Sequence, residues 1–246
     1  MTTNSRIRYM AVLMPAHNEE QHIGRALSAL KIAADTLKRE CPEVRLTITA
    51  VLDSCTDRSV EITAAHGASD PRFNVVEVAL HSTGASRDFG IRAALHHLPA
   101  AATGSVWLAN TDADSTVPQN WLTRQLVLAN AGADAILGSV EPDPQDVEPA
   151  ILRRWMELHP FREDHQHIYG ANFGVRASAY LAAGGFPWLR AHEDKVLVER
   201  LRRHGFSVTA TDTLRVLTSG RTQARAPEGF AAYLRALGAQ LPASAS

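Results

Sequence analysis

The organisation of this chain is clearest in Val106-Trp107-Leu108-Ala109-Asn110-Thr111-Asp112-Ala113-Asp114-Ser115-Thr116-Val117-Pro118, an apolar run of strand type that ends in two carboxylates. Side chains at i and i+2 of an extended segment project to the same side, so Asp112 and Asp114 are expected to face one small volume. Two adjacent carboxylates repel unless a cation or a shared proton lies between them. A divalent cation such as Mg²⁺ or Mn²⁺ commonly bridges protein carboxylates to substrate phosphates. The pattern therefore predicts a site for a metal and a diphosphate, with a solvated Asx-rich turn as the alternative.

Similar strand-type runs precede this segment, and a helical pattern separates each from the next. Strands are predicted at Tyr9–Met14, Arg45–Leu52, Phe73–Leu80 and Val106–Thr111. Helices are predicted at Glu19–Arg39 with Asn18 as the N-cap, from Asp57 to about Ala65, at Gly84–Leu98 and at Pro118–Ala131. Strands that alternate with helices of this length predict an α/β fold with a mostly parallel central sheet flanked by helices.

Polar clusters follow all four of these strands. They are Pro15–Glu19, Asp53–Asp57, Gly84–Arg87 and Asp112–Asp114. Ligands of parallel α/β sheets bind beyond the carboxyl ends of the strands, so the four clusters are expected along one rim.

The second half is less regular, and we find no linker that would separate two domains. We predict strands at Asp134–Val140 and Ile168–Val175, and helices at Val147–Leu158, Ala177–Ala183, Lys195–His204 and Glu228–Leu237. Residues 1–246 are therefore expected to form a single domain, with a nucleotide-binding half at 9–116, an acceptor-binding half at 117–225 and a C-terminal helix and tail at 226–246.

The composition narrows the classes of partner. With 25 Lys and Arg against 26 Asp and Glu, the formal charge is -1, which disfavours nucleic acid as a partner and leaves a small ligand. Cys41 and Cys55 are the two cysteines, which suits a reducing cytoplasm. No apolar run is long enough for a transmembrane segment, so a cytoplasmic protein is expected.

An ordered set of motifs resembles the family 2 glycosyltransferases of the GT-A fold. The motifs are Val12-Leu13-Met14-Pro15-Ala16-His17-Asn18-Glu19-Glu20, Asp53-Ser54-Cys55-Thr56-Asp57, Asp112-Ala113-Asp114, Gly170-Ala171-Asn172-Phe173-Gly174-Val175-Arg176 with Gly184-Gly185-Phe186, and Glu193-Asp194. Each motif is weakly specific alone, but the order and spacing over residues 9–225 make the set specific.

The resemblance implies a nucleotide-sugar donor, an Mg²⁺ or Mn²⁺ ion and a role for each matching residue. Pro15, Ala16 and Glu19 would form the first nucleotide-contacting loop, and Asp53 would accept a hydrogen bond from the base or ribose. Asp114 would bind the metal directly, and Asp112 would hold the ribose or the metal's water shell. Arg87, and with it Arg221, would lie near the diphosphate.

The same resemblance implies that Asp194, preceded by Glu193, is the general base of an inverting reaction. The predicted function is thus the metal-dependent transfer of a hexose, with UDP-hexose as the expected donor, to a small or lipid-linked acceptor. Leu52 stands where many relatives have another Asp, which leaves Asp53 alone for base recognition. No Gln-x-x-Arg-Trp segment follows Asp194, which argues against a processive synthase, and Leu217-Thr218-Ser219 offers no late His ligand.

Several of these residues have simpler explanations. Glu193 and Asp194 could merely complement a helix dipole, and Arg221 and Arg225 could be a solvated face. His159, His165 and His167 could hold a metal, but a polar loop over the acceptor explains them better. Trp155, Phe161, Tyr169 and Trp188 could be an acceptor platform or ordinary core.

Three other functions are alternatives. A haloacid-dehalogenase-type phosphotransferase would fit Asp112-x-Asp114-x-Thr116, but no downstream Gly-Asp pair is present. A nucleotidyltransferase would need a glycine-rich first loop in place of Ala16-His17-Asn18-Glu19. A catalytically silent nucleotide-sugar-binding protein is the third alternative, disfavoured by the intact Asp112, Asp114 and Asp194.

Overall fold

The computed structural model describes residues 5–96, 100–189, 192–223 and 229–240. Its strands are β1 (Tyr9–Ala16), β2 (Arg45–Asp53), β3 (Phe73–Val78), β4 (Val106–Asn110), β5 (Ser115–Thr116), β6 (Ala135–Pro142), β7 (Phe173–Arg176) and β8 (Val208–Thr218). Its α-helices are α1 (Ile23–Glu40), α2 (Ser59–Ser69), α3 (Thr83–Leu95), α4 (Trp121–Asn130), α5 (Pro149–Leu158), α6 (Ala177–Ala182), α7 (Glu193–Arg203) and α8 (Phe230–Ala239). Short 3₁₀ segments lie at Ala100–Ser105 and Gly170–Asn172.

The strands form one sheet in the order β3-β2-β1-β4-β7-β6-β8-β5. The neighbours β3, β2, β1 and β4 are parallel, and so are β6 and β8. The strands β7 and β5 run antiparallel to their neighbours. The predicted α/β fold, with a mostly parallel sheet flanked by helices, is therefore confirmed.

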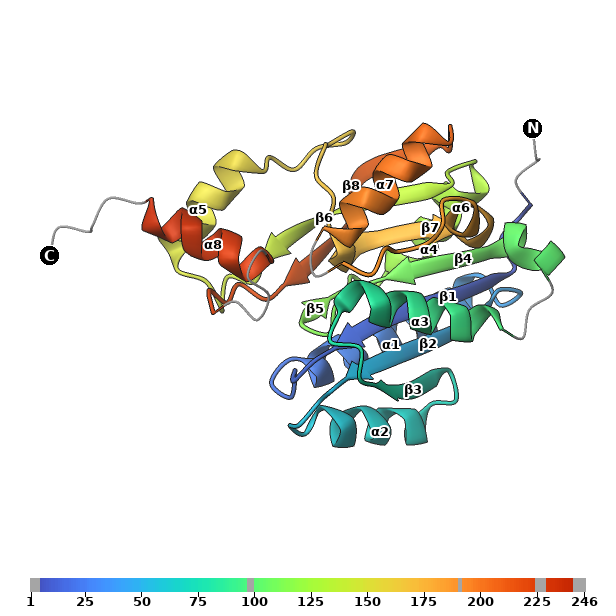
Figure 1. Cartoon of the computed structure of the whole chain (residues 1–246), viewed down its shortest axis with the longest axis horizontal. Coiled ribbons are helices and arrows are strands. Elements are labelled where there is room, and N and C mark those ends of the chain that lie inside the picture. Colours follow the sequence, from blue (N-terminus) through green and yellow to red (C-terminus); the bar gives the residue numbers. More distant parts are fainter. Residues whose placement is uncertain (1–4, 97–99, 190–191, 224–228, 241–246) are drawn as a thin grey trace, which may run out of the picture.

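Two apolar cores cover the two faces of the sheet. The first packs α1, α4, α5 and α8 against one face, around side chains such as Leu27, Trp121 and Trp155. The second packs α3, α6 and α7 against the other face, around Leu13, Phe173 and Leu197. The helices α5 and α8 lie side by side at one end of the long axis (Figure 1).

The carboxyl ends of β1, β2 and β4 point to the same edge of the sheet, where β5 also lies (Figure 1). The sequence analysis did not anticipate β5 and β8. They pair with each other through Ser115 and Thr218, so the end of β8 lies directly beside the segment that follows β4. This pairing brings the last third of the chain to the predicted rim.

The helix predicted from Glu19 begins later, at Ile23, and Asn18 is not its N-cap. Asn18 instead adopts a φ of 53°, and its side-chain oxygen accepts a hydrogen bond of 2.7 Å from the Thr56 amide. Asn18 therefore ties the loop after β1 to the loop after β2. The prediction failed because an Asn that tolerates the left-handed region can serve a turn as readily as a cap.

The segment Gly170–Arg176 is almost entirely buried and mainly stabilises the centre of the sheet. The amide of Asn172 donates to the carbonyls of Ser139 and Leu214 at 2.7 and 2.8 Å and accepts from the Trp121 indole at 2.9 Å. A Cβ on Gly138 would lie 2.2 Å from this amide, so only glycine fits there. The strand predicted from Ile168 is shorter, because a 3₁₀ turn at Gly170–Asn172 precedes β7.

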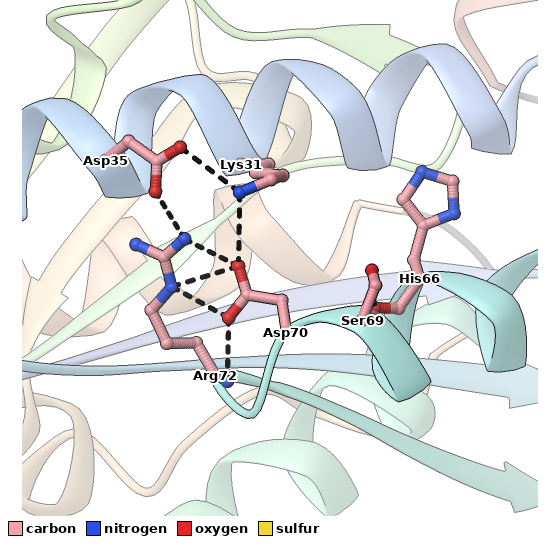
Figure 2. A network of polar contacts seen from close by, with 6 residues as sticks. All are labelled: Lys31, Asp35, His66, Ser69, Asp70 and Arg72. Carbon is pink, nitrogen blue, oxygen red and sulfur yellow. Dashed lines mark hydrogen bonds and ion pairs between the residues drawn. The ribbon is translucent and has the colours of Figure 1, made fainter.

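An ionic network joins α1 to the turn between α2 and β3 (Figure 2). The buried Asp70 carboxylate accepts three hydrogen bonds from the Arg72 guanidinium, of which the shortest measures 2.5 Å, and Lys31 lies 3.7 Å away. Arg72 also reaches Asp35 on α1. The Arg72 hydrogen bonds lower the pKa of Asp70 to about 2, in spite of its burial. The network therefore favours the folded state at neutral pH.

Within the described ranges, no helix has the length and the apolar character needed to span a bilayer.

Candidate active site

The strand ends open into a cavity of about 560 Å³, which we call the DxD cavity. All the rim clusters predicted from the sequence contribute to it. Its lining includes Pro15, Ala16 and Glu19 after β1, Asp53 after β2, Ser86 on α3, and Asp112 and Asp114 after β4. The end of β8 adds Thr218, Ser219 and Arg221, and α8 adds Phe230.

Asp112 and Asp114 are held by a tight turn between β4 and β5. The Thr111 amide donates to the Leu13 carbonyl, and the Ser115 amide closes the turn on the Asp112 carbonyl, both at 3.1 Å. The Asp112 side chain is 34% exposed and that of Asp114 is 17% exposed. The two carboxylates therefore reach the cavity from a backbone that is fixed on both sides.

Arg221 is placed beside Asp114 by the end of β8. The Ser219 amide donates to the Asp114 carbonyl at 3.1 Å, which fixes the chain immediately before Arg221. The guanidinium then lies 2.9 Å from the Asp114 carboxylate and donates two hydrogen bonds of 2.8 Å to Glu19. One arginine thus pairs with two carboxylates from different loops of the DxD cavity.

The charge of this cavity is suited to a further cation. Burial, together with the neighbouring carboxylates of Asp112 and Glu19, raises the pKa of Asp114 to about 7, although Arg221 opposes the shift. Asp112 and Asp114 offer the oxygen ligands that Mg²⁺ and Mn²⁺ prefer. No group of three or more His, Cys, Asp or Glu side chains in the described parts of the chain forms a complete metal site. The two carboxylates therefore fit a metal whose other ligands are water and substrate phosphate.

Both carboxylate oxygens of Asp53 accept hydrogen bonds from the surrounding loop. One of its oxygens accepts from the amides of Leu80 and His81, and the other accepts from the Ser82 amide and the Ser86 hydroxyl. Burial raises its pKa, but the amide hydrogen bonds outweigh this effect, so the pKa lies below the ordinary value. Asp53 thus holds the loop before α3 against β2, and its predicted contact with a base or ribose stays a prediction.

Arg87 lies behind the DxD cavity. Its guanidinium is 2% exposed, pairs with Asp112 and donates to Glu193 at 2.7 Å. A Cβ on Gly170 would lie 2.5 Å from the guanidinium, so this glycine makes room for Arg87. Arg87 therefore links the turn after β4 to the start of α7, while its predicted proximity to a diphosphate stays a prediction.

A second cavity of about 610 Å³ adjoins the first, and we call it the aromatic cavity. The two share Thr83, Asp112, Thr218, Gly229 and Phe230. Arg87 and the first turn of α7, including Glu193 and Asp194, line one side of the aromatic cavity.

The two acidic residues of α7 differ in environment. Glu193 is buried, which raises its pKa against the opposing effect of Arg87. Asp194 is half-buried, and its Oδ1 accepts a hydrogen bond of 2.8 Å from the Lys195 amide. Asp194 is therefore the more accessible of the two carboxylates.

The opposite side of the aromatic cavity carries His159, His167, Tyr169, Phe230 and Tyr233. Of the four aromatic residues weighed as a platform, Tyr169 lines this cavity, while Trp155 is buried beneath it. Phe161 packs under Arg215 at 3.4 Å, and the side chain of Trp188 is 73% exposed. His165 is buried and lines neither cavity. Arg225 and the predicted helix start at Glu228 lie outside the described residues.

Thr218, Ser219, Phe230 and Tyr233 line the cavities but are not among the site residues predicted from the sequence. The strand β8 was not predicted, and the predicted C-terminal helix had no known position relative to the site. The signal for β8 was present. The run Val208-Thr209-Ala210-Thr211-Asp212-Thr213-Leu214-Arg215-Val216-Leu217-Thr218 is rich in β-branched residues, as half-buried strands are. The position of α8 depends on contacts with α5, which no local pattern predicts.

Comparison with known proteins gives one sequence match. Residues 11–182 match the family model described as Glycosyl transferase family 2. No curated protein matches the chain.

Solved structures are similar in fold. A mannosyltransferase from Pyrobaculum calidifontis, in complex with GDP-Man and Mn²⁺, has a TM-score of 0.60 and 16% identity, and the match covers 87% of this chain and 57% of that one. This chain thus spans little more than half of that enzyme's length.

Two further solved structures are synthases of sugar-phosphoglycerates by name. Mannosyl-3-phosphoglycerate synthase from Rubrobacter xylanophilus has a TM-score of 0.55 and 15% identity, with 95% of this chain and 73% of that one covered. Glucosyl-3-phosphoglycerate synthase from Mycobacterium tuberculosis, in complex with phosphoglyceric acid, has a TM-score of 0.51 and 14% identity, with 96% and 82% covered. At these identities the likeness shows the fold alone.

Proposed function

Because the chain belongs to glycosyl transferase family 2, we propose that it moves a hexose from a nucleoside diphosphate to an acceptor hydroxyl, in a metal-dependent, non-processive reaction with inversion. One observation carries this proposal. The DxD cavity, with its carboxylates and Arg221, adjoins the aromatic cavity, with Asp194, and Asp112 belongs to both. A donor in the first cavity would therefore present its sugar to an acceptor in the second.

The donor's nucleoside and diphosphate would lie in the DxD cavity. Pro15, Ala16 and the Asp53 loop form the wall on which the nucleoside rests, and Arg221 lies at the diphosphate end, beside Asp114. UDP-hexose is the first donor to test. The remainder of residues 9–116 supplies the frame of this half, and residues 117–225 supply most of the acceptor side.

Asp112 and Asp114 would hold an Mg²⁺ or Mn²⁺ ion. A mannosyltransferase of similar fold was solved with GDP-Man and Mn²⁺, which supports a divalent metal. When bound, such a metal neutralises charge that develops on the leaving diphosphate. Arg221 contributes a second positive charge at the same place. To do so it must exchange part of its contact with Glu19 and Asp114 for the phosphate oxygens.

Asp194 would act as the general base. An acceptor hydroxyl has a pKa far above neutrality, so it needs a base within about 3 Å when its oxygen attacks the anomeric carbon. The hydroxyl proton passes to the Asp194 carboxylate, the new C–O bond forms, and the bond from the anomeric carbon to the diphosphate oxygen breaks. Glu193, paired with Arg87, would hold that first turn in place.

Calorimetric titration tests the donor site directly. UDP and GDP are titrated into the protein with Mn²⁺ and then with EDTA, and the titration is repeated on Asp114→Ala. We expect one nucleotide to bind with Mn²⁺, to bind much more weakly with EDTA, and to lose its metal-dependent binding in the variant. Asp35→Ala is the matched control, because the half-exposed Asp35 lies on α1, outside both cavities.

Absence of nucleotide binding under both conditions would contradict the proposal. If binding and metal dependence are found but no transfer occurs with any acceptor, the silent nucleotide-sugar-binding protein becomes the better description.

A further inference from the structure

The acceptor side contains a continuous aromatic wall. The rings of His159 and His167 lie 4.7 Å apart, and those of His167 and Tyr169 lie 5.9 Å apart. Tyr233 and Phe230, both on α8, meet His159 and Tyr169 edge to face at 5.5 and 6.4 Å. All five side chains line the aromatic cavity. The rings thus form a continuous, weakly polar aromatic side of the cavity, tilted and edge-on to one another, that faces the first turn of α7.

This wall is anchored to the apolar core. The His159 ring stacks on Trp155 with centroids 4.6 Å apart and an interplanar angle of 8°. Its Nδ1 also lies 2.9 Å from the Trp155 carbonyl, within hydrogen-bond distance. Trp155 itself is 1% exposed. A ligand that stacks on the wall would therefore meet rings that are already ordered, which lowers the entropic cost of binding.

The imidazoles of the wall are uncharged at neutral pH. Burial lowers the pKa of His159, and burial together with His159 and His165 lowers the pKa of His167. Both ordinary values already lie below 7, so the shifts leave neutral rings. The wall offers π faces and ring nitrogens, not a positive charge for an anion.

The facing side does not supply that charge either. Among the described residues, the aromatic cavity is lined by four carboxylates, those of Asp112, Glu193, Asp194 and Glu199, and by three cationic side chains, those of Arg87, Lys195 and Arg202. Arg87 is already paired with two of the carboxylates. Asp112 would be engaged by the metal, which leaves three carboxylates against three cationic side chains. The cavity therefore carries no net positive charge that would favour an acceptor with a phosphate or carboxylate.

We propose that the acceptor of this enzyme is a neutral sugar ring, which lies with one apolar face on the wall of His159, His167 and Tyr233 and turns a hydroxyl toward Asp194. The axial and ring C–H groups of a pyranose are weakly positive and pack favourably on the negative face of an aromatic ring. The hydroxyls of such a ring are matched by the carboxylates and by Lys195 on the opposite side. This inference rests on the proposed function and names its acceptor class.

The test compares probes that share one aryl group. p-Nitrophenyl glucoside, mannoside and galactoside are titrated into the full chain with Mn²⁺ and the nucleotide that it binds. p-Nitrophenyl phosphate serves as the matched anion, and 3-phosphoglycerate serves as an anion without the ring. We expect at least one glycoside to bind at millimolar concentration and both anions to bind at least tenfold more weakly.

Two wall variants locate the binding. Tyr233→Ala and His167→Ala are expected to weaken glycoside binding at least fivefold and to leave nucleotide binding unchanged. Tyr233 is 39% exposed, so its truncation removes little of the core. His66→Ala is the control, since His66 lies on α2 beside the network of Figure 2 and lines neither cavity.

The outcomes separate this inference from the proposed function. Preferential binding of either anion, glycoside binding unchanged by both wall variants, or no glycoside binding to a nucleotide-loaded protein would overturn the neutral-sugar acceptor while the donor site stands. Failure of nucleotide binding itself would overturn the proposed function, whatever the glycosides do.

Discussion

Arg221 donates two hydrogen bonds of 2.8 Å to Glu19, a residue 202 positions earlier in the chain. Glu19 is 6% exposed, so this pair connects the loop after β1 to the end of β8 in a largely dehydrated place. The same guanidinium lies 2.9 Å from Asp114. Glu19 therefore orients the cation of the DxD cavity, and its predicted contact with a nucleotide stays a prediction.

Replacement of this cation should affect both stability and donor binding. Arg221→Met leaves Glu19 and Asp114 without their shared positive charge, and we expect a loss of about 3 kcal/mol in the free energy of unfolding. We also expect nucleotide diphosphate affinity with Mn²⁺ to fall by roughly tenfold or more. Arg221→Lys keeps the charge but loses the bidentate geometry, so its stability and nucleotide affinity should lie between those of Arg221→Met and the native protein.

Urea unfolding and calorimetry measure the two effects. Arg58→Met is the control, because Arg58 is an exposed arginine whose ion pair with Glu61 is also exposed. Equal donor affinity in Arg221→Met and the native protein would mean that the diphosphate lies elsewhere.

The neighbouring acids Glu193 and Asp194 should behave differently when neutralised. Asp194→Asn removes the proposed base, so transfer should fall by about 10²- to 10⁴-fold while donor affinity is retained. Glu193→Gln removes the buried partner of Arg87, so it should lower the unfolding temperature as well as the rate. Single-turnover transfer and thermal unfolding distinguish the two. An Asp194→Asn variant with native turnover would rule out this residue as the base.

The close contact between Gly138 and Asn172 predicts that adding one methyl group at position 138 strongly destabilises the protein. A Cβ on Gly138 would collide with the Asn172 amide, which holds three partners from β6, β8 and α4. Gly138→Ala should therefore destabilise the protein by about 3 kcal/mol.

Gly67→Ala is the matched control for this change. Its nearest neighbour would be 3.7 Å away and it lies within α2, so alanine there should stabilise by roughly 0.5–1 kcal/mol. The denaturant midpoints of both variants show whether their stability changes have opposite signs. A mild effect at Gly138 would show that the Asn172 side chain can move aside.

The network of Figure 2 predicts a pH dependence of stability. The pKa of Asp70 is lowered from 3.8 to about 2 in the folded protein, so its contribution is present above pH 4 and is lost as the pH falls toward 2. By linkage this contribution is about 2 kcal/mol at pH 7.

Asp70→Asn should lose that stability at pH 7. The difference in free energy of unfolding between this variant and the native protein should shrink as the pH falls from 4 to 2. Urea titrations across this range measure it, with the exposed Glu61→Gln as the control. A difference that stays constant with pH would show that the effect comes from packing rather than from charge.

Much of the donor side could be predicted from local patterns. Apolar runs of strand length specify β1, β2, β3 and β4, and parallel pairing alone places their carboxyl ends at one edge of the sheet. The polar clusters that follow these strands could therefore be placed on one rim without any knowledge of side-chain contacts. The turn that carries Asp112 and Asp114 was correctly located for this reason.

The acceptor side could not be predicted in the same way. The wall of the aromatic cavity joins a loop after α5 to α8, and neither segment carries a pattern that specifies the other. Trp155 illustrates the difficulty, because an aromatic residue near a site can be a platform or the core beneath it, and only packing decides which. Trp188 was weighed as a platform and lies outside both cavities.

The sequence by itself determined the order of the helices and of the strands other than β5 and β8, and the rim of carboxylates, because hydrophobic periodicity and turn residues act over a few positions. Only the tertiary structure decided that Arg221 meets Glu19 and Asp114, that Arg87 is buried between Asp112 and Glu193, and that α8 closes the acceptor side. Those contacts depend on pairings between distant segments, such as β5 with β8, whose free energy comes from burial and charge neutralisation in the assembled fold.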